Sequence, residues 1–139
     1  MNVEKTNYGY YIQLVKGDKV MDSLTEFAKE HGLTSGTFSG IGAFRELTVG
    51  YFDTETQSYP ERHFKETHEV LSCKGNFSLK DGVPFPHCHI VFADTDYNAK
   101  GGHLIEATVQ VTGEFRVLTS DNEITREYDE EIGLHLWDF

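Results

Sequence analysis

Three histidines lie close together in the segment from Pro86 to Leu104. His87 and His89 are two residues apart in a run rich in β-branched and aromatic residues, which predicts a strand. Side chains alternate between the two faces of a strand, so these two imidazoles share one face. His103 follows the glycine pair Gly101-Gly102 and opens a second apolar run. If the two runs pair antiparallel, the third imidazole can return to the face of the first two.

Three imidazoles that converge from strands suit a divalent metal such as zinc, with water or a carboxylate in the fourth position. The same spacing also fits polar side chains on a solvated face, because His-x-His on a strand is a weak motif. Residues 94–98, between the two runs, carry turn chemistry and should reverse the chain. The metal site therefore depends on the two runs pairing with each other.

Three histidines around zinc leave a coordination position open, which lowers the pKa of a bound water to about 7. A zinc-dependent enzyme acting on a small molecule, such as a hydrolase, would also need a general base nearby. Glu106 and Glu114 are the candidate catalytic residues, although the sequence does not fix the strand face that each occupies. The chain offers no fingerprint for a nucleotide cofactor.

One helix and about eight strands are expected to position these residues. Apolar residues at helical spacing predict a helix over Lys19–His31, with Asp18 as its N-cap and Gly32 as its C-terminal stop. Strands are predicted at Tyr8–Val15, Leu33–Phe44, Glu46–Phe52, Arg62–Glu66, Glu69–Leu79, Cys88–Ala93, Ile105–Val111 and Glu114–Leu118. The tail segments Ile124–Tyr128 and Leu134–Phe139 could add one or two edge strands. Turns are expected at Lys80-Asp81-Gly82 and at Thr112-Gly113.

The order of these elements shows no strand–helix–strand alternation, so the prediction is an α+β fold, mainly an antiparallel β-sheet with one main helix. The sequence leaves undecided whether a second, short helix forms. The 139 residues suffice for one domain and are too few for two ordinary ones. We expect a single domain over residues 1–139, with its core at about residues 8–118 and C-terminal strands in residues 119–139.

The formal net charge is −11, from 23 acidic and 12 basic residues. Such a surface repels DNA phosphates, and no run of Lys or Arg offsets it, so direct nucleic-acid binding is disfavoured. No apolar run is long enough to span a membrane, and the first residues do not form a signal peptide. We therefore expect a cytoplasmic protein without a membrane partner. Cys73 and Cys88 fall in predicted strands and are expected to be buried free thiols.

Several motifs, taken in order, resemble the plants-and-prokaryotes-conserved domain, abbreviated PPC. They are Gly17-Asp18-Lys19-Val20, Phe27-Ala28-Lys29-Glu30-His31-Gly32, the glycine-rich stretch Ser35–Ala43, Glu69-Val70-Leu71-Ser72 with Gly75-Asn76, Asp81-Gly82, His87-Cys88-His89 and Gly101-Gly102-His103-Leu104. The likeness covers the chain from about Tyr8 to about Leu118. The ordered series is specific to the family, whereas each motif alone is not.

The resemblance implies a sandwich-like α+β domain that assembles as a homotrimer. It also implies that His87, His89 and His103 stand where family members hold a metal, usually zinc. Bacterial members are often described as DNA-binding proteins by analogy with the plant branch. This chain lacks the Arg-Gly-Arg-Pro AT-hook of that branch, and residues 66–71 depart from the plant segment that recruits partner proteins.

Three functions follow as hypotheses. The first is a trimeric metal-binding module that acts through a small-molecule ligand or a partner. The second is a zinc-dependent enzyme, hydrolase-like, on a small molecule. The third is a DNA-binding transcriptional regulator, which rests on the family description alone and is opposed by the acidic charge.

Overall fold

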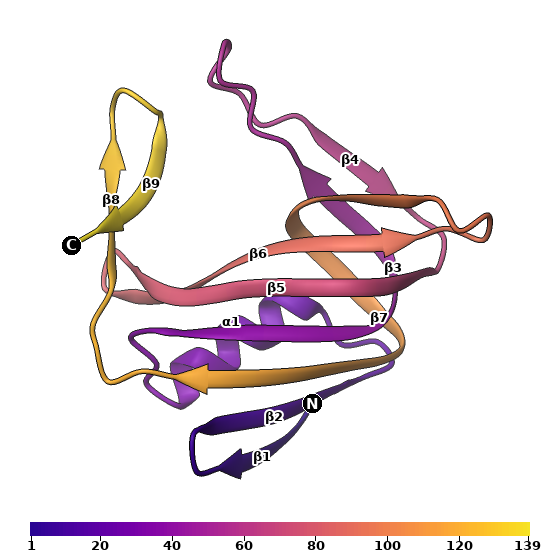
Figure 1. Cartoon of the computed structure of the whole chain (residues 1–139), viewed down its shortest axis with the longest axis horizontal. Coiled ribbons are helices and arrows are strands. Elements are labelled where there is room, and N and C mark those ends of the chain that lie inside the picture. The colour runs from indigo at the N-terminus through magenta and orange to yellow at the C-terminus, as the bar shows by residue number, and fades with distance from the viewer.

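The computed structural model describes residues 1–139 as nine strands and one helix (Figure 1). In chain order the elements are β1 (Asn2–Thr6), β2 (Gly9–Val15), α1 (Val20–Glu30), β3 (Gly36–Gly50), β4 (Glu61–Phe64), β5 (His68–Lys80), β6 (Val83–Ala93), β7 (Ala99–Thr119), β8 (Thr125–Asp129) and β9 (Leu134–Asp138). The sheet order is β1-β2-β7-β3-β5-β8-β9, with β4 beside β3 and with β6 paired to both β5 and β7.

Four strands close a ring, because β7 pairs with β3, β3 with β5, β5 with β6, and β6 with β7. The closure depends on the length of β3 and β7, which have 15 and 21 residues. Shifts of register bend both strands, and Glu46 in β3 takes a positive φ of 51° at one of them. As a result the first part of β7 pairs with β6, and its second part pairs with β2.

The fold is α+β with one helix, as expected, but strand orientation is mixed. Every strand pair is antiparallel except β5 and β8, which run parallel at Leu79 and Lys80. No second helix forms. The strands β8 and β9 lie where strands were predicted in the C-terminal tail. They form a hairpin that stands beside the main sheet in Figure 1. The strand β1 was not expected from the sequence.

The predicted turn at Thr112-Gly113 is wrong, because β7 continues through it. Gly42 of β3 pairs with Gly113 at this point, and a Cβ on Gly42 would collide with the carbonyl oxygen of Thr112. The glycines therefore permit close contact between two bent strands rather than a reversal of the chain. In the same way, the expected break between strands near Phe44 is an irregularity inside the single strand β3.

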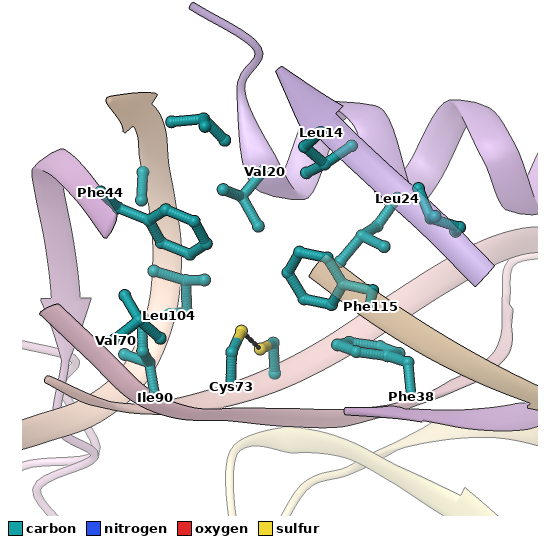
Figure 2. Close-up of a cluster of buried hydrophobic side chains, with 14 of the residues drawn as sticks. Leu14, Val20, Leu24, Phe38, Phe44, Val70, Cys73, Ile90, Leu104 and Phe115 are labelled. Atoms are coloured by element: carbon teal, nitrogen blue, oxygen red, sulfur yellow. Dashed lines mark hydrogen bonds between the residues drawn. The ribbon is translucent and has the colours of Figure 1, made fainter. Parts of the chain in front are cut away.

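The helix α1 covers one face of the sheet, and the hydrophobic core lies between them (Figure 2). Val20, Leu24 and Phe27 of the helix are fully buried and meet Phe44 and Phe115 of the sheet in this core. Burying a side chain of this size contributes about 1.5–3 kcal/mol relative to leaving it exposed. This packing fixes one face of the sheet as the inner face. The opposite face, here called the outer face, carries the exposed side chains of the same strands.

Asp18 is not the N-cap of α1. Its carboxylate accepts a hydrogen bond from the Val15 backbone N–H at 3.0 Å and pairs with the amino terminus, and the Val15 bond is the main reason its pKa is lowered. The N-cap position is Lys19, which makes no side-chain capping bond. Glu106 of β7 caps the helix instead, by accepting hydrogen bonds from the backbone N–H groups of Met21 and Asp22 at 2.9 and 3.2 Å.

The two cysteines are free and completely buried, as expected. Their Sγ atoms are 3.2 Å apart in the core, where Figure 2 labels Cys73. The hydrogen bond with Cys73, together with burial, raises the pKa of the Cys88 thiol. A buried thiol with a raised pKa is a weak nucleophile, because the thiolate is the reactive form.

Both thiols should therefore react only when the chain unfolds. In the native protein, a thiol reagent such as dithionitrobenzoate is expected to modify Cys73 and Cys88 at least about 100-fold more slowly than in urea. The absorbance of the released product measures both rates and gives two thiols per chain in urea. Fast modification of either thiol in native buffer would contradict this packing.

Candidate metal centre

Strands β6 and β7 bring the three histidines of the sequence analysis together. Cys88 and Ile90 of β6 point into the core, so His87 and His89 point to the outer face. The antiparallel register places His103 of β7 directly opposite His89. One nitrogen of each ring lies within 4.8 Å of those of the other two. The two runs predicted from the sequence therefore pair antiparallel, as β6 and β7, which was the condition for the three histidines to meet.

Close approach of β7 to β6 relies on the glycine pair before His103. A Cβ on Gly101 would lie 2.5 Å from the carbonyl oxygen of Ile90, which is closer than real Cβ atoms come. Gly102 pairs with Ile90, and the next register pair is His103 with His89. A larger residue at Gly101 would therefore push apart the two strands that carry the histidines.

The surroundings of His87 and His103 favour the neutral form of these two imidazoles. The pKa of His87 is lowered to about 4, first by burial and then by the positive charges of His103, Arg126 and His89. Burial also lowers the pKa of His103, with contributions from His89 and Arg126. A neutral imidazole has a free lone pair, which is the form that binds a metal.

His103 also carries an unsatisfied polar atom. Its Nδ1 is buried and has no hydrogen-bond partner in the chain. A buried polar atom without a partner is costly, and native structures contain few of them. Its presence in a group of three histidines fits a partner that the polypeptide itself does not supply. Two nitrogens on one zinc ion lie at most about 4 Å apart, since each bond is about 2 Å, so small side-chain rotations suffice.

Neither candidate catalytic carboxylate joins the histidines, because the cluster consists of imidazoles alone. Both oxygens of Glu106 accept backbone hydrogen bonds at the start of α1, and one also accepts from the Ala107 N–H. Glu114 lies on the outer face, paired with Ile41 of β3. Three strand spacings separate it from His89, about 14 Å at the usual distance between strands. The general base expected for a hydrolase is thus absent from the cluster.

Arg126 of β8 belongs to the surroundings of the site and was missed by the sequence analysis. It is only 9% exposed, and one of its Nη atoms lies 3.5 Å from Nδ1 of His87. Its other donors bond the Ser78 hydroxyl at 2.7 Å, the Asn76 side-chain oxygen at 3.0 Å and the His135 carbonyl oxygen at 3.1 Å. Burial lowers its pKa, but arginine starts so far above neutrality that the guanidinium stays charged.

One signal in the sequence could have drawn attention to Arg126. It is the one Lys or Arg in residues 119–139, among seven acidic residues of that segment. The position of Arg126 beside His87, however, depends on the parallel pairing of β8 with β5, which no local sequence pattern predicts.

Two aromatic rings flank the guanidinium of Arg126. The ring centroids of Phe85 and Trp137 lie 5.5 and 5.9 Å from its Cζ atom.

The remaining histidines have other contacts. His63 bonds the Thr48 hydroxyl and the Glu46 carboxylate, and His68 is buried against Phe92. His31 lies at the end of α1, where its Nδ1 donates to the Phe27 carbonyl oxygen, and His135 packs on Tyr128. Tyr59, by contrast, packs its ring edge-on against His103 at 5.3 Å and so borders the cluster.

A hollow of about 780 Å³ opens on the outer face beyond the histidines. It spans β1, β2, β7, β3 and β5, and its lining includes Tyr11, Ile41, Leu71 and Lys74. Three of these are large hydrophobic side chains that are more than half exposed: Tyr11 at 54% and Ile41 and Leu71 at 55% each. The glycine-rich stretch of β3 therefore borders both the core and an open apolar surface.

Comparison with known proteins gives a family and several similar structures. The model of the Plants and Prokaryotes Conserved (PCC) domain matches residues 1–121. A structure from Bacteroides thetaiotaomicron, described as a "putative DNA binding protein", is 33% identical, with a TM-score of 0.96, covering 99% of this chain and 96% of that one. No curated protein matches the chain.

Two archaeal structures are also similar. A metal-containing protein from Archaeoglobus fulgidus is 35% identical, with a TM-score of 0.87, over 99% of this chain and 96% of that one. A plant- and prokaryote-conserved protein from Pyrococcus horikoshii is 30% identical, also with a TM-score of 0.87, over 99% of this chain and 94% of that one.

The capping role of Glu106 can be tested by denaturation. We expect Glu106→Ala to lower the free energy of unfolding by about 1–3 kcal/mol, because it leaves the first amides of α1 without an acceptor. Glu26→Ala, at an exposed position of the same helix, should change it by less than about 0.5 kcal/mol. Urea titrations at one protein concentration give both values. Equal effects of the two substitutions would show that Glu106 does not cap the helix.

Proposed function

The chain belongs to the Plants and Prokaryotes Conserved domain family, and we propose that it is a metal-binding module in which His87, His89 and His103 hold one divalent ion. The observation that carries this proposal is the convergence of the three imidazoles around the unpartnered Nδ1 of His103. The low pKa of His87 supports it, since that ring needs no deprotonation near neutral pH. A similar archaeal protein is described as metal-containing.

Zinc is the proposed metal. Imidazole nitrogens suit zinc among the common divalent ions, whereas magnesium and calcium prefer oxygen ligands, which the cluster lacks. Three protein ligands are typical of zinc sites that keep a position for a small molecule, and structural sites use four. When bound, such an ion supplies Lewis acidity at that open position. We therefore propose ligand binding at the metal as the working role of the module.

A hydrolase is the second candidate, and the geometry supports it less. The open position fits it, but Glu106 is occupied at the helix and Glu114 lies about three strands away. Tyr59 borders His103, but burial raises the pKa of its hydroxyl, which keeps the hydroxyl protonated and unavailable as a general base. A metal-binding module without its own general base accounts for all these observations.

Self-association as a homotrimer is the second part of the proposal. The resemblance to the family implied three copies, and the outer face offers a surface suited to contact. Large exposed apolar side chains gather there, with Val111 at 66% exposure beside Ile41 and Leu71. Contiguous exposed apolar surface of this kind is typical of protein–protein contacts.

A DNA-binding role has weaker support. Similar bacterial structures carry that description, and it belongs to those proteins. The net charge of this chain is −11, which opposes approach to phosphates. The one buried arginine, Arg126, is held by bonds within the chain and is not presented to a groove.

Removing any one of the three histidines should abolish stoichiometric metal binding. We expect the wild-type protein to hold one zinc ion per chain, and His87→Ala, His89→Ala and His103→Ala each to weaken zinc binding by more than about 100-fold. Elemental analysis after dialysis measures the content, and competition with a chromophoric chelator measures the affinity.

The matched control is His63→Ala, because His63 lies on β4 with hydrogen-bond partners of its own. It should keep one zinc ion per chain. A full equivalent of metal in the three cluster variants, or loss of metal in the control, would place the site elsewhere.

The outer face can be tested by its effect on mass in solution. Sedimentation should give about three times the 15.8 kDa of one chain for the wild type. Ile41→Lys and Leu71→Lys place a charge on the apolar surface and should shift the protein to single chains. Val83→Lys, at an exposed position of the β5–β6 hairpin, is the control and should leave the mass unchanged. A wild type that sediments as one chain would refute the trimer.

A further inference from the structure

The charges around the three histidines point to the chemistry of the ligand. We infer that the site takes a small molecule bearing an oxyanion, a carboxylate or a phosphate group, which binds at the open metal position within the field of Arg126. This inference rests on the proposed metal site and names the class of ligand that the site accepts. The histidines lie on the same outer face as the surface proposed for self-association, and Lys74 lines the hollow next to them.

The first step is a count of charge. Three neutral imidazoles leave the full double positive charge of a divalent ion uncompensated, and no Asp or Glu belongs to the cluster. An imidazole binds a metal through a neutral nitrogen and brings no negative charge of its own. A partly buried site of this kind is stabilised by an anion in the remaining position.

The second step is the position of Arg126. Its guanidinium lies 3.5 Å from the ring of His87 and is 9% exposed, so water screens it little. Its hydrogen-bond partners are a hydroxyl, an amide oxygen and a backbone carbonyl, all of them neutral. No carboxylate lies within ion-pair distance of it, although buried arginines are rarely left without one.

The third step is that the same bonds leave part of Arg126 free. A guanidinium has five N–H donors. Three are taken by Ser78, Asn76 and His135, and a fourth lies 3.5 Å from Nδ1 of His87, which can accept it only while that nitrogen carries neither a proton nor a metal. One N–H therefore has no acceptor in the chain. A bound oxyanion would offer one, and it would neutralise the metal and the arginine together.

Lys74 adds to the positive field from the other side. It lies on β5 directly opposite His89 in the strand register, on the same face, and it makes no ion pair. The chain carries 23 acidic residues, yet none of them belongs to the histidine cluster and none forms an ion pair with Arg126 or Lys74. The local preference for an anion is thus opposite to the charge of the protein as a whole.

Cobalt(II) provides the test, because its visible absorption changes when a ligand enters its coordination shell. The cobalt-loaded protein is titrated with acetate and with methylphosphonate, at ionic strength held constant with sodium perchlorate. Imidazole serves as the neutral ligand. We expect saturable spectral changes with at least one oxyanion, and the preferred one shows whether the natural group is a carboxylate or a phosphate.

The variants separate charge from structure. Arg126→Met should weaken oxyanion binding at least tenfold and change imidazole binding less than threefold. Arg126→Lys keeps the positive charge and should bind the oxyanion with an affinity much nearer to that of the wild type. Lys74→Met, at an exposed position, should weaken oxyanion binding about threefold and keeps the test decisive if Arg126→Met does not fold. Equal loss of both ligand types in Arg126→Met would reveal a structural role and overturn the inference.

Two further outcomes distinguish this inference from the proposal beneath it. In the first outcome, the wild type takes up one cobalt ion per chain through the three histidines and shows no spectral change with either oxyanion. That result overturns the inference alone. A wild type that takes up no cobalt overturns the metal site and the inference together.

Discussion

The pairing of β6 with β7 is the interaction on which the site depends. Backbone hydrogen bonds between these strands place His89 opposite His103, and the alternation of side chains along β6 adds His87 on the same face. Gly101 permits the close approach, since a side chain there would meet the backbone of Ile90. The three imidazoles are thus positioned by main-chain geometry, which is more rigid than a loop. A strand slipped by one residue would turn every one of these side chains to the other face.

The same alternation gives β6 two separate tasks. Between the histidines, Cys88 points inward to Cys73 and helps to fill the core beneath α1. The core residues therefore fix the plane from which the histidines project. Glu106 couples the helix to β7 by capping its first turn, so the strand that carries His103 is tied to the helix that covers the core. The fold and the site share these few contacts.

Local patterns predicted much of this arrangement. The period of two along His87-Cys88-His89 and the turn residues after Ala93 indicated that three imidazoles would converge if the two runs paired, and the antiparallel pairing of β6 with β7 meets that condition. The helix was predicted to within one residue of each end of α1. Contacts distant in the sequence were not predictable. The N-cap was assigned to Asp18 because the true cap, Glu106, lies 85 residues from Met21. The turn assigned to Thr112-Gly113 was wrong because the glycine there serves a strand contact with Gly42.

The C-terminal hairpin also has a consequence for how the family can diversify. The family match ends at residue 121, whereas the guanidinium beside His87 comes from β8, which begins at Thr125. The proposed metal ligands and the arginine beside them therefore come from different parts of the chain, the histidines within the family match and Arg126 beyond it. If Arg126 sets the preference for an anion as inferred, a relative that differed only in its last two strands would keep the three histidines and lose that preference.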